Sequence, residues 1–423
     1  MNVNINKKYN RYYSLIIIII CTIGVMGALG FARFGYTMIL PEMKKGLELD
    51  DSQAGDLATG NMIGYLLLAI TCGFLSSRFS PRLIITVFMF VISGSMFLTG
   101  LAPDFMVAMV GRILTGIGSG GTNVPIMGLV SAWFVSKRRG LAAGIAVSGS
   151  SFGLLLTGLI IPRIHEYYIT GGWRFSWFYL GGLVFVIAII CMIFLRNRPD
   201  DKGISVIGTK GIIENKNTED QESLKNKSVS SIKWSLVYKT PSIWNLAIIY
   251  ILFGFSYIIY ATFFSRYLIW EAGFLEQEAG ALWATLGAVS IISGFIWGSI
   301  SDILGRKYGL ALVFFLQSLC YLIFGLCKSM PGYYISAGLF ALTAWSIPAI
   351  MAAAAGDIVG SRLAPAALGF ITLFLGIGQA LGPFIAGRIA VLNNSYTIAF
   401  IIAGLAALLG AIASLLLKIK KDT

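Results

Sequence analysis

Long apolar runs separated by short polar stretches dominate the pattern along the chain. A helix of about 20 apolar residues spans a bilayer, and twelve runs of roughly that length or longer are present. They cover Tyr13–Leu40, Asp56–Leu75, Leu83–Leu101, Phe105–Phe134, Leu141–Ile161, Phe175–Leu195, Ser242–Leu268, Ala279–Ile300, Tyr308–Cys327, Gly332–Ala355, Pro365–Leu392 and Thr397–Leu417. Six runs precede the polar stretch 197–240 and six follow it. The pattern therefore predicts an all-α integral membrane protein with twelve transmembrane helices.

The two sets of six runs repeat one another. Residues 73–82 read GFLSSRFSPR and residues 298–307 read GSISDILGRK, and the same offset carries Gln53-Ala54-Gly55 onto Glu278-Ala279-Gly280. A repeat of this length in an apolar chain is typical of two homologous membrane halves. We therefore predict two pseudo-symmetric six-helix bundles. Their bounds are 1–196 and 241–423, with a cytoplasmic linker over 197–240.

Composition supports the same class of protein. The chain is 57% hydrophobic and 12% charged, whereas soluble domains have roughly 45–50% and about 25%. The first apolar run is longer than the apolar core of a signal peptide and no small-residue cleavage site follows it, so we expect it to be retained as a helix. The cysteines lie in apolar runs without CxxC spacing, which predicts no metal, cofactor or redox chemistry. No Walker loop is present, which excludes an ATP-driven pump.

The net charge of +13 would suggest a nucleic-acid partner in a soluble protein. Most of the 32 lysine and arginine residues instead lie before the first run, after the last run, in the linker and in alternate short loops. The positive-inside rule places those segments in the cytoplasm. We therefore expect a monomeric plasma-membrane protein with both termini cytoplasmic and no nucleic-acid partner. The basic linker is expected to contact membrane lipids, with a bound regulator as the alternative.

Twelve spans in two halves, with one loop sequence in both, resemble the major facilitator superfamily. The loop pattern of that family is G-x-x-x-D-R-x-G-R-[RK]. The second copy keeps Gly298, Asp302, Gly305, Arg306 and Lys307, and the first copy keeps Gly73, Arg78 and Arg82 but has Ser77 in place of Asp. The resemblance implies that these residues form a gating latch that holds the two halves in an outward-facing state. The first half lacks the carboxylate of this latch, because Ser77 replaces the Asp. Residues 30–41 and 53–65 look like the YbfB-type branch of the family.

Ionised side chains at membrane depth need a partner, a cavity or an escape to the interface. Arg33 lies eight residues before Pro41 and Arg112 lies eight after Asp104, which at 1.5 Å per residue puts both about 12 Å below the outer face. Arg112 begins a polar stripe that continues at helical spacing to Asn123. Such stripes face a water-filled cavity, because lipid would leave them unsatisfied. Matched depth suggests a shared site.

The polar and aromatic residues at this depth form the predicted substrate site. It comprises Arg33, Tyr36, Asn61, Tyr65, Arg112 and Asn123 from the first half, and Tyr257, Tyr260 and Gln379 from the second. Helix packing or proton coupling is the alternative role for Arg112, which matches a family position assigned to these roles, and packing is the alternative for the aromatic residues. Arg266 and Arg388 are expected to snorkel to the interface, and His165 is expected to be a solvated loop residue.

No Asp or Glu falls at the midpoint of any predicted helix, so the cavity is net positive. Guanidinium groups bind carboxylate, sulfonate or phosphate in a bidentate manner. We therefore expect a secondary transporter of a small organic anion, most simply a carboxylate, and no enzyme. Coupling is by proton symport, with Asp56 or the substrate carrying the proton, or by anion exchange. The alternatives are an exporter of hydrophobic drugs and a transport-dead receptor.

Overall fold

The computed structural model describes residues 2–134, 136–197, 235–360 and 363–417. Within these ranges every regular element is a helix. The elements are α1 (Asn2–Val25), η1 (Met26–Phe34), α2 (Gly35–Gly46), α3 (Asp51–Arg78), α4 (Pro81–Leu101), α5 (Phe105–Trp133), α6 (Ser136–Tyr167), α7 (Gly172–Phe194), α9 (Ser235–Lys239), α10 (Pro241–Trp270), α11 (Glu276–Ser290), α12 (Ser293–Leu304), α13 (Arg306–Leu326), α14 (Met330–Thr343), α15 (Ser346–Val359), α16 (Ala364–Asn393) and α17 (Thr397–Leu415). The predicted linker lies outside the described residues apart from Asn197 and residues 235–240.

Ten helices of the described chain are long and apolar enough to cross a membrane. The pair α11 and α12, bent by 44°, gives an eleventh span. The remaining predicted run falls on α3, a helix of 28 residues. One face of α3 packs against other helices, with Gly64 against the backbone of α5 and Gly55 against that of α16. The all-α membrane fold is confirmed.

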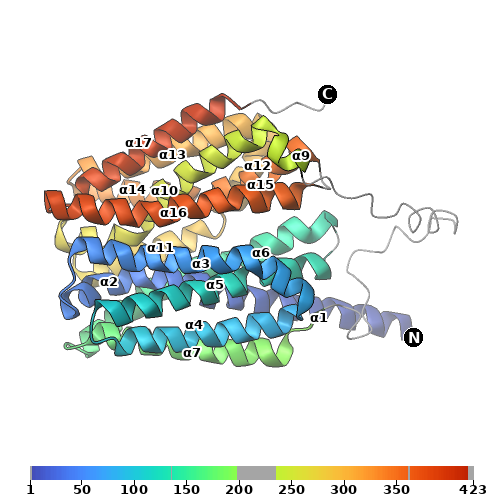
Figure 1. The fold of residues 1–423 in the computed structure, drawn as a ribbon, viewed down its shortest axis with the longest axis horizontal. Helices are drawn as coiled ribbons and strands as arrows, with labels where there is room; N and C mark the ends of the chain where they lie inside the picture. The colour runs from blue at the N-terminus through green and yellow to red at the C-terminus, as the bar shows by residue number, and fades with distance from the viewer. Residues whose placement is uncertain (1, 135, 198–234, 361–362, 418–423) are drawn as a thin grey trace.

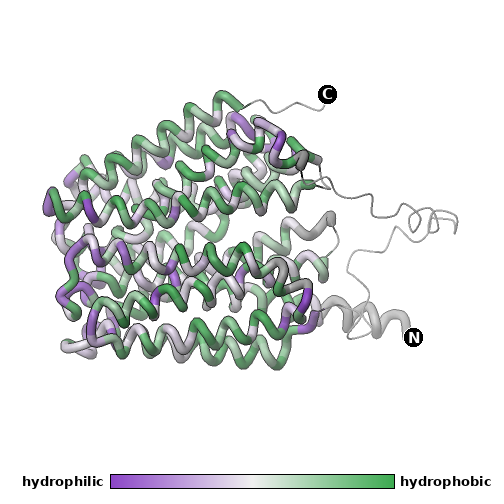
Figure 2. Tube along the Cα trace, viewed as in Figure 1, coloured by the Kyte–Doolittle hydropathy of each residue, from purple (hydrophilic) through white to green (hydrophobic). Residues whose placement is uncertain are grey.

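Two bundles lie side by side along their length, with α1–α7 in one and α10–α17 in the other (Figure 1). Apolar residues dominate the middle of the helices, and hydrophilic residues concentrate at their ends (Figure 2). We call the end where α1 begins and α17 ends the terminal end. The opposite end, with the turns between α2 and α3 and between α10 and α11, is the distal end.

The bundles meet through two equivalent helix pairs. A Cβ added at Gly55 of α3 would clash with the carbonyl oxygen of Pro383 on α16, and one added at Gly280 of α11 would clash with that of Gly158 on α6. The offset that relates the two sequence repeats carries Gly55 onto Gly280 and Gly158 onto Pro383. The contact surface therefore repeats the pseudo-symmetry of the sequence, with small residues allowing close backbone approach.

The same faces are open toward the terminal end. Gly144 lies seven residues, or about two turns, before Ser151 on α6, and Ser151 accepts a hydrogen bond from the indole of Trp345 in the other bundle at 2.8 Å. Gly369 lies seven residues before Gly376 on α16, and Gly376 contacts Leu66 of α3. A Cβ added at Gly144 or Gly369 would meet nothing within 4 Å. The bundles are therefore closed at the distal end and separated at the terminal end.

The first span is continuous but changes helix type. Its middle segment η1 is a π-helix of nine residues, and the N–H of Gly35 donates to the carbonyl of Gly30 in the wider i→i+5 pattern. A Cβ at Gly30 would lie 2.6 Å from the Cα of Gly153 on α6. Only glycine fits at this crossing. A π-helical segment alters the 3.6-residue spacing of side chains that the sequence pattern assumes, and Arg33 lies within it.

Candidate functional site

The Arg33 guanidinium lies between the two bundles. Its Nη2 donates to the hydroxyl oxygen of Tyr257 on α10 at 2.9 Å. The side-chain Nε2 of Gln379 on α16 donates to the same oxygen at 2.8 Å. Arg33 is 8% exposed, and its Nε has no hydrogen-bond partner. Three of the predicted site residues, from three helices and both bundles, are therefore brought together.

Two further predicted residues join this group from the first bundle. The Arg33 guanidinium lies 5.9 Å from the centre of the Tyr65 ring. Asn123 on α5 donates through Nδ2 to the Tyr65 hydroxyl at 3.0 Å. The Oδ1 atom of Asn123 is buried without a partner. We call Arg33, Tyr65, Asn123, Tyr257 and Gln379 the central group.

Arg112 occupies a different environment, inside the first bundle. It is 1% exposed, and its Nη1 donates to the carbonyl of Ala32 at 2.8 Å. Its guanidinium lies 4.6 Å from the centre of the Tyr36 ring and 5.2 Å from that of Trp177. Asn61 donates to the carbonyl of Arg112 at 3.1 Å. These contacts join η1, α2, α3, α5 and α7, so Arg112 and Asn61 hold the bundle together.

Tyr36 and Tyr260 also point away from the central group. The Tyr36 hydroxyl donates to the carbonyl of Ala54 on α3 at 2.8 Å. Tyr260 lies inside the second bundle, where its hydroxyl is 3.0 Å from Ser336 Oγ and its ring stacks on Phe340. Thr37, rather than Tyr36, points to the same helix as Arg33 and donates to the carbonyl of Ala261 on α10 at 2.6 Å.

The central group has no carboxylate to balance its charge. Among the described residues, neither Arg33 nor Arg112 has an Asp or Glu oxygen within ion-pair distance. The acidic residues of the ion pairs lie near the helix ends instead. Burying an unpaired charge is costly, so an anion that reaches Arg33 would be stabilised there. The same part of the chain contains no cluster of His, Cys, Asp or Glu that could hold a metal ion.

Ion pairs join the bundles at the distal end. Asp56, the predicted proton carrier, accepts from Arg388 at 2.8 Å. Arg266 lies 3.5 Å from the Asp51 carboxylate, which also accepts from the Tyr396 hydroxyl at 3.0 Å. Burial raises the pKa of Tyr396 well above its ordinary value, so this hydroxyl stays protonated and donates.

Two expectations about the distal end are therefore corrected. Arg266, with 8% of its side chain exposed, does not snorkel to solvent, because it pairs with the Asp51 carboxylate of the other bundle. Arg388 also pairs across the bundle interface, with Asp56, but 42% of its side chain is exposed, so its expected position at the interface stays a prediction. His165 is not a solvated loop residue. It is 8% exposed, and its Nδ1 lies 2.5 Å from the Glu276 carboxylate across the bundle interface. The sequence did contain a hint of these pairs, because the acidic and basic partners all fall near the predicted outer ends of their helices.

The printed partners of Arg306 and Arg82, two of the predicted latch residues, lie within their own bundles. In the second bundle Arg306 forms ion pairs with Asp302 and, at 2.9 Å, with Asp357. Gly305 has φ +91°, a left-handed conformation that lets the chain turn between α12 and α13. Gly298 faces open space. In the first bundle Arg82 donates to the carbonyl of Met192 at 3.1 Å, Arg78 is exposed, and Gly73 lies within α3.

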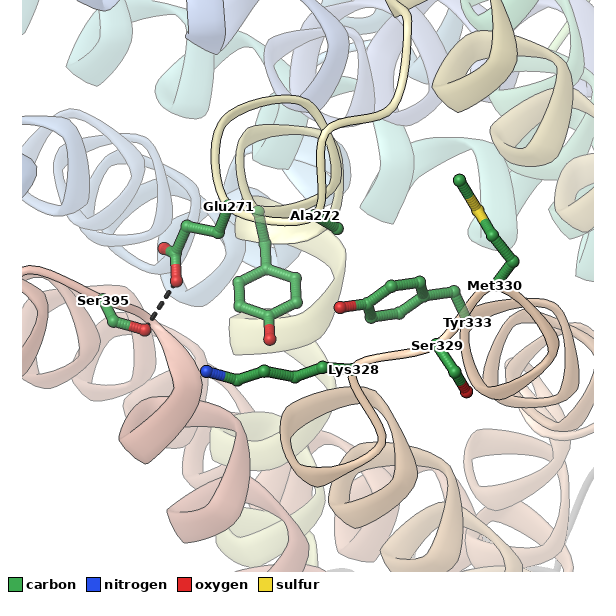
Figure 3. A pocket seen from close by; sticks show the side chains of 8 residues that line it. Glu271, Ala272, Lys328, Ser329, Met330, Tyr333 and Ser395 are labelled. Atoms are coloured by element: carbon green, nitrogen blue, oxygen red, sulfur yellow. Dashed lines mark hydrogen bonds between the residues drawn. The ribbon is translucent and has the colours of Figure 1, made fainter.

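A separate pocket of about 450 Å³ opens at the distal end of the second bundle (Figure 3). Its lining includes Tyr267, Glu271, Lys328 and Tyr333. The Glu271 carboxylate already accepts from Ser395 Oγ at 2.5 Å and from a backbone N–H at 3.0 Å. None of the predicted site residues lines this pocket, so it is distinct from the central group.

The sequence matches the Major Facilitator Superfamily over residues 20–344 and over residues 271–423. It is 22% identical over 399 residues to a protein of Cupriavidus necator named as a probable sulfoacetate transporter, with 90% of this chain and 89% of the relative covered. It is 23% identical over 402 residues to the hexuronate transporter of Bacillus subtilis, with the same coverage.

The fold is similar to that of a bacterial homologue of the human lysosomal transporter Spinster, whose crystal structure is described as inward-facing and occupied. The TM-score is 0.70 at 17% identity, covering 96% of this chain and 95% of that chain. The resemblance to the YbfB-type branch stays a prediction. Two bundles related by a sequence repeat, multiple membrane spans and these matches lead to one conclusion: the chain belongs to the Major Facilitator Superfamily.

Proposed function

We propose that this chain moves a small organic anion, most simply a carboxylate, across the plasma membrane by alternating access. As a member of this family it is a transporter and not an enzyme. The observation that carries the substrate class is the buried Arg33 guanidinium, which lies between the bundles without a carboxylate partner. The relatives named for sulfoacetate and hexuronate both carry names of anions, which supports the same class.

The central group has the chemistry that an organic anion requires. A guanidinium offers a planar fork of N–H donors that matches a carboxylate. Arg33 retains a free buried N–H at Nε, while its Nη2 donates to the Tyr257 hydroxyl, which also accepts from Gln379. Because these residues come from both bundles, an anion bound to Arg33 contacts the surface on which the bundles move relative to one another. That placement is what alternating access needs.

We propose that Asp56 links a proton to this movement. Its carboxylate pairs with Arg388 of the other bundle, at the closed distal end. Protonation of Asp56 would remove the negative charge and weaken this contact between the bundles. If the distal end opens only when Asp56 is protonated, the transporter is a proton symporter. An anion exchanger would open without this proton. Asp56→Asn should therefore abolish the response of uptake to an imposed pH gradient if the mechanism is symport.

Orientation follows from charge. We propose that the terminal end faces the cytoplasm, because the basic residues of the chain concentrate on that side. The loops around Arg78, Arg82, Asp302 and Arg306 would then form the cytoplasmic latch when the terminal end closes.

Two measurements test the proposed function. Purified protein is first screened by thermal shift against acids of varied length and charge, because a ligand that binds the folded state raises its apparent stability. The best ligand is then used in uptake by proteoliposomes. We expect saturable uptake of an acid that also raises Tm. Stabilisation by hydrophobic cations, with no response to any acid, would contradict the proposal and favour a drug exporter.

A further inference from the structure

We infer that Arg266 is a second anion-binding site, at the distal end of the second bundle, and that it binds the substrate carboxylate when the bundles separate there. The inference rests on the proposed function and adds a place where the anion binds before it reaches Arg33. The Arg266 guanidinium is buried, and its Nε and Nη1 both lack a hydrogen-bond partner. Arg33 and Arg112 each have one such nitrogen.

Arg266 has a single carboxylate partner among the described residues, and that partner lies in the other bundle. Its Nη2 is 3.5 Å from Oδ1 of Asp51 on α3. Asp51 also forms an ion pair with Lys44 of α2, in its own bundle, and accepts from the Tyr396 hydroxyl at 3.0 Å. The charge of Asp51 is therefore balanced without Arg266, whereas Arg266 has no second acid within ion-pair distance in the described chain.

Opening of the distal end would separate these partners unequally. Lys44 stays with Asp51 in the first bundle, and Arg266 leaves with α10 in the second. Glu271, the next acid along the chain, is held within the second bundle, where it accepts from a serine hydroxyl at 2.5 Å and from a backbone N–H at 3.0 Å. Arg266 would then face the open interface without a carboxylate. A guanidinium pairs well with a carboxylate, so an incoming anion can take the place of Asp51.

The rings that hold the Arg266 guanidinium would remain with it. The guanidinium lies 4.3 Å from the centre of the Trp270 ring and 5.9 Å from that of Tyr396, both in the second bundle. Aromatic faces attract a guanidinium and leave its N–H edge free for a ligand. Arg388 is a weaker candidate, because 42% of its side chain is exposed and a hydrated charge gains little from a partner.

Arg266 lies on the distal side of the central group. Nine residues of α10 separate it from Tyr257, which accepts a hydrogen bond from Arg33. This separation corresponds to about 13 Å of helix. An anion that enters from the distal end therefore meets Arg266 before Arg33. Loss of Arg266 should impair capture from the distal side and spare binding at Arg33.

The test compares two substitutions that remove the same ion pair from opposite sides, Arg266→Gln and Asp51→Asn. The measurement is initial uptake by intact cells at equal surface expression. The probe is whichever of radiolabelled lactate, succinate and glucuronate the native protein transports with the lowest KM. Losing the pair favours an open distal end, so a purely structural role of Arg266 predicts that both variants lower KM or leave it unchanged.

We expect Arg266→Gln to raise KM about tenfold or more, because a hydrogen-bonded charge partner of the anion is lost. Asp51→Asn should not raise KM, since Arg266 is kept. Arg266→Lys should raise KM about threefold, because the charge remains and the bidentate fork is lost. By calorimetric titration of the purified protein, the Kd of the same probe should stay close to the native value in Arg266→Gln, whereas Arg33→Gln should abolish binding.

The outcomes separate this inference from the proposed function. A KM that falls or is unchanged in Arg266→Gln, as in Asp51→Asn, would show that Arg266 only holds the distal end closed, and an anion transporter would remain. An equal rise in both variants would assign the effect to the lost pair and overturn the inference as well. If Arg266→Gln does not reach the membrane, the KM of Arg266→Lys against that of Asp51→Asn decides. No uptake of the three acids by the native protein, with no acid raising its Tm, would remove the proposed function and this inference with it.

Discussion

Arg33 and Arg112 are buried at similar predicted depth, but their other contacts differ. Arg33 bridges to the second bundle through Tyr257 and keeps a free N–H. Arg112 is enclosed by its own bundle, with a backbone carbonyl and two aromatic rings as partners, and its Nε likewise has no hydrogen-bond partner. Similar depth therefore does not imply a similar role, and the two can be separated by experiment.

We predict that Arg112→Gln destabilises the empty protein. The change removes the hydrogen bond to Ala32 and the contacts with Tyr36 and Trp177, at a cost of about 2–4 kcal/mol. The measurement is Tm in detergent without ligand, with Arg33→Gln as the matched control, for which we expect a smaller change in Tm. A normal Tm for Arg112→Gln together with loss of ligand binding would show instead that Arg112 contacts the substrate.

The sequence predicted which residue types meet at the site better than which way they point. Arg33, Tyr65, Asn123, Tyr257 and Gln379 were predicted and are brought together by the fold. Their joint role in binding stays a prediction. Tyr36 and Tyr260 were included as polar aromatic residues at the expected depth. Depth does not determine which neighbouring helix a side chain faces, and the π-helical η1 before Tyr36 departs from regular 3.6-residue spacing.

At the scale of helices, the apolar runs predicted the spans well and the interruptions poorly. The break between α11 and α12 falls at Ile291 and Ile292, inside a run with no proline to mark it. The π-helix η1 likewise has no proline and no polar interruption except Arg33. Such breaks depend on packing between helices, as at the crossing of Gly30 and Gly153. A single-residue hydropathy pattern contains no information about that packing.

The faces of α6 and α11 provide a matched pair of glycine substitutions. We predict that Gly280→Ala lowers stability, because the new Cβ would lie 2.5 Å from both the carbonyl oxygen of Gly158 and Cγ of Pro162. Forcing the helices apart should cost about 1–3 kcal/mol. Gly144→Ala should leave Tm unchanged, since nothing lies within 4 Å of its Cβ. Thermal unfolding in detergent measures both, and equal changes would contradict a closed distal end.

The loops that resemble the family latch give a second prediction for an element. We expect Asp302→Ala to slow transport more than Ser77→Ala, because only the second repeat has a carboxylate at this position. The Asp302 side chain is 61% exposed and pairs with Arg306 in its own bundle, so little stability should be lost. Initial uptake rates at equal surface expression provide the measurement. Small, equal effects would show that neither loop acts as a latch.

At the scale of the whole molecule, the repeat in the sequence appears as a repeated contact between the bundles. The inter-bundle ion pairs of Asp51, Asp56 and Glu276 gather at the distal end. The repeated loop in the sequence predicts the two halves, but no sequence pattern indicates which end is closed. That property depends on the relative position of two rigid bundles, which a pattern within each bundle does not determine.

A native cysteine tests the orientation of the molecule. Cys327 is exposed at the distal end, whereas Cys21, Cys72, Cys191 and Cys320 are buried. We predict that a membrane-impermeant maleimide labels Cys327 in intact cells and that Cys327→Ser removes the label. In that variant, a cysteine replacing the exposed Tyr308 at the terminal end should be labelled only after permeabilisation. Labelling of that cysteine in intact cells would reverse the proposed topology.

The uptake and binding of an acid by Arg33 variants test the central claim most directly. The ligand is the acid that most raises the Tm of the native protein, and the measurement is its Kd and saturable uptake in proteoliposomes with equal protein incorporation. We predict that Arg33→Lys keeps the charge but weakens binding about tenfold, because the bidentate fork is lost. Arg33→Gln should abolish saturable uptake while the protein still folds. Uptake by Arg33→Gln with unchanged apparent affinity would contradict the account, since Arg33 would then be structural and the substrate need not be an anion.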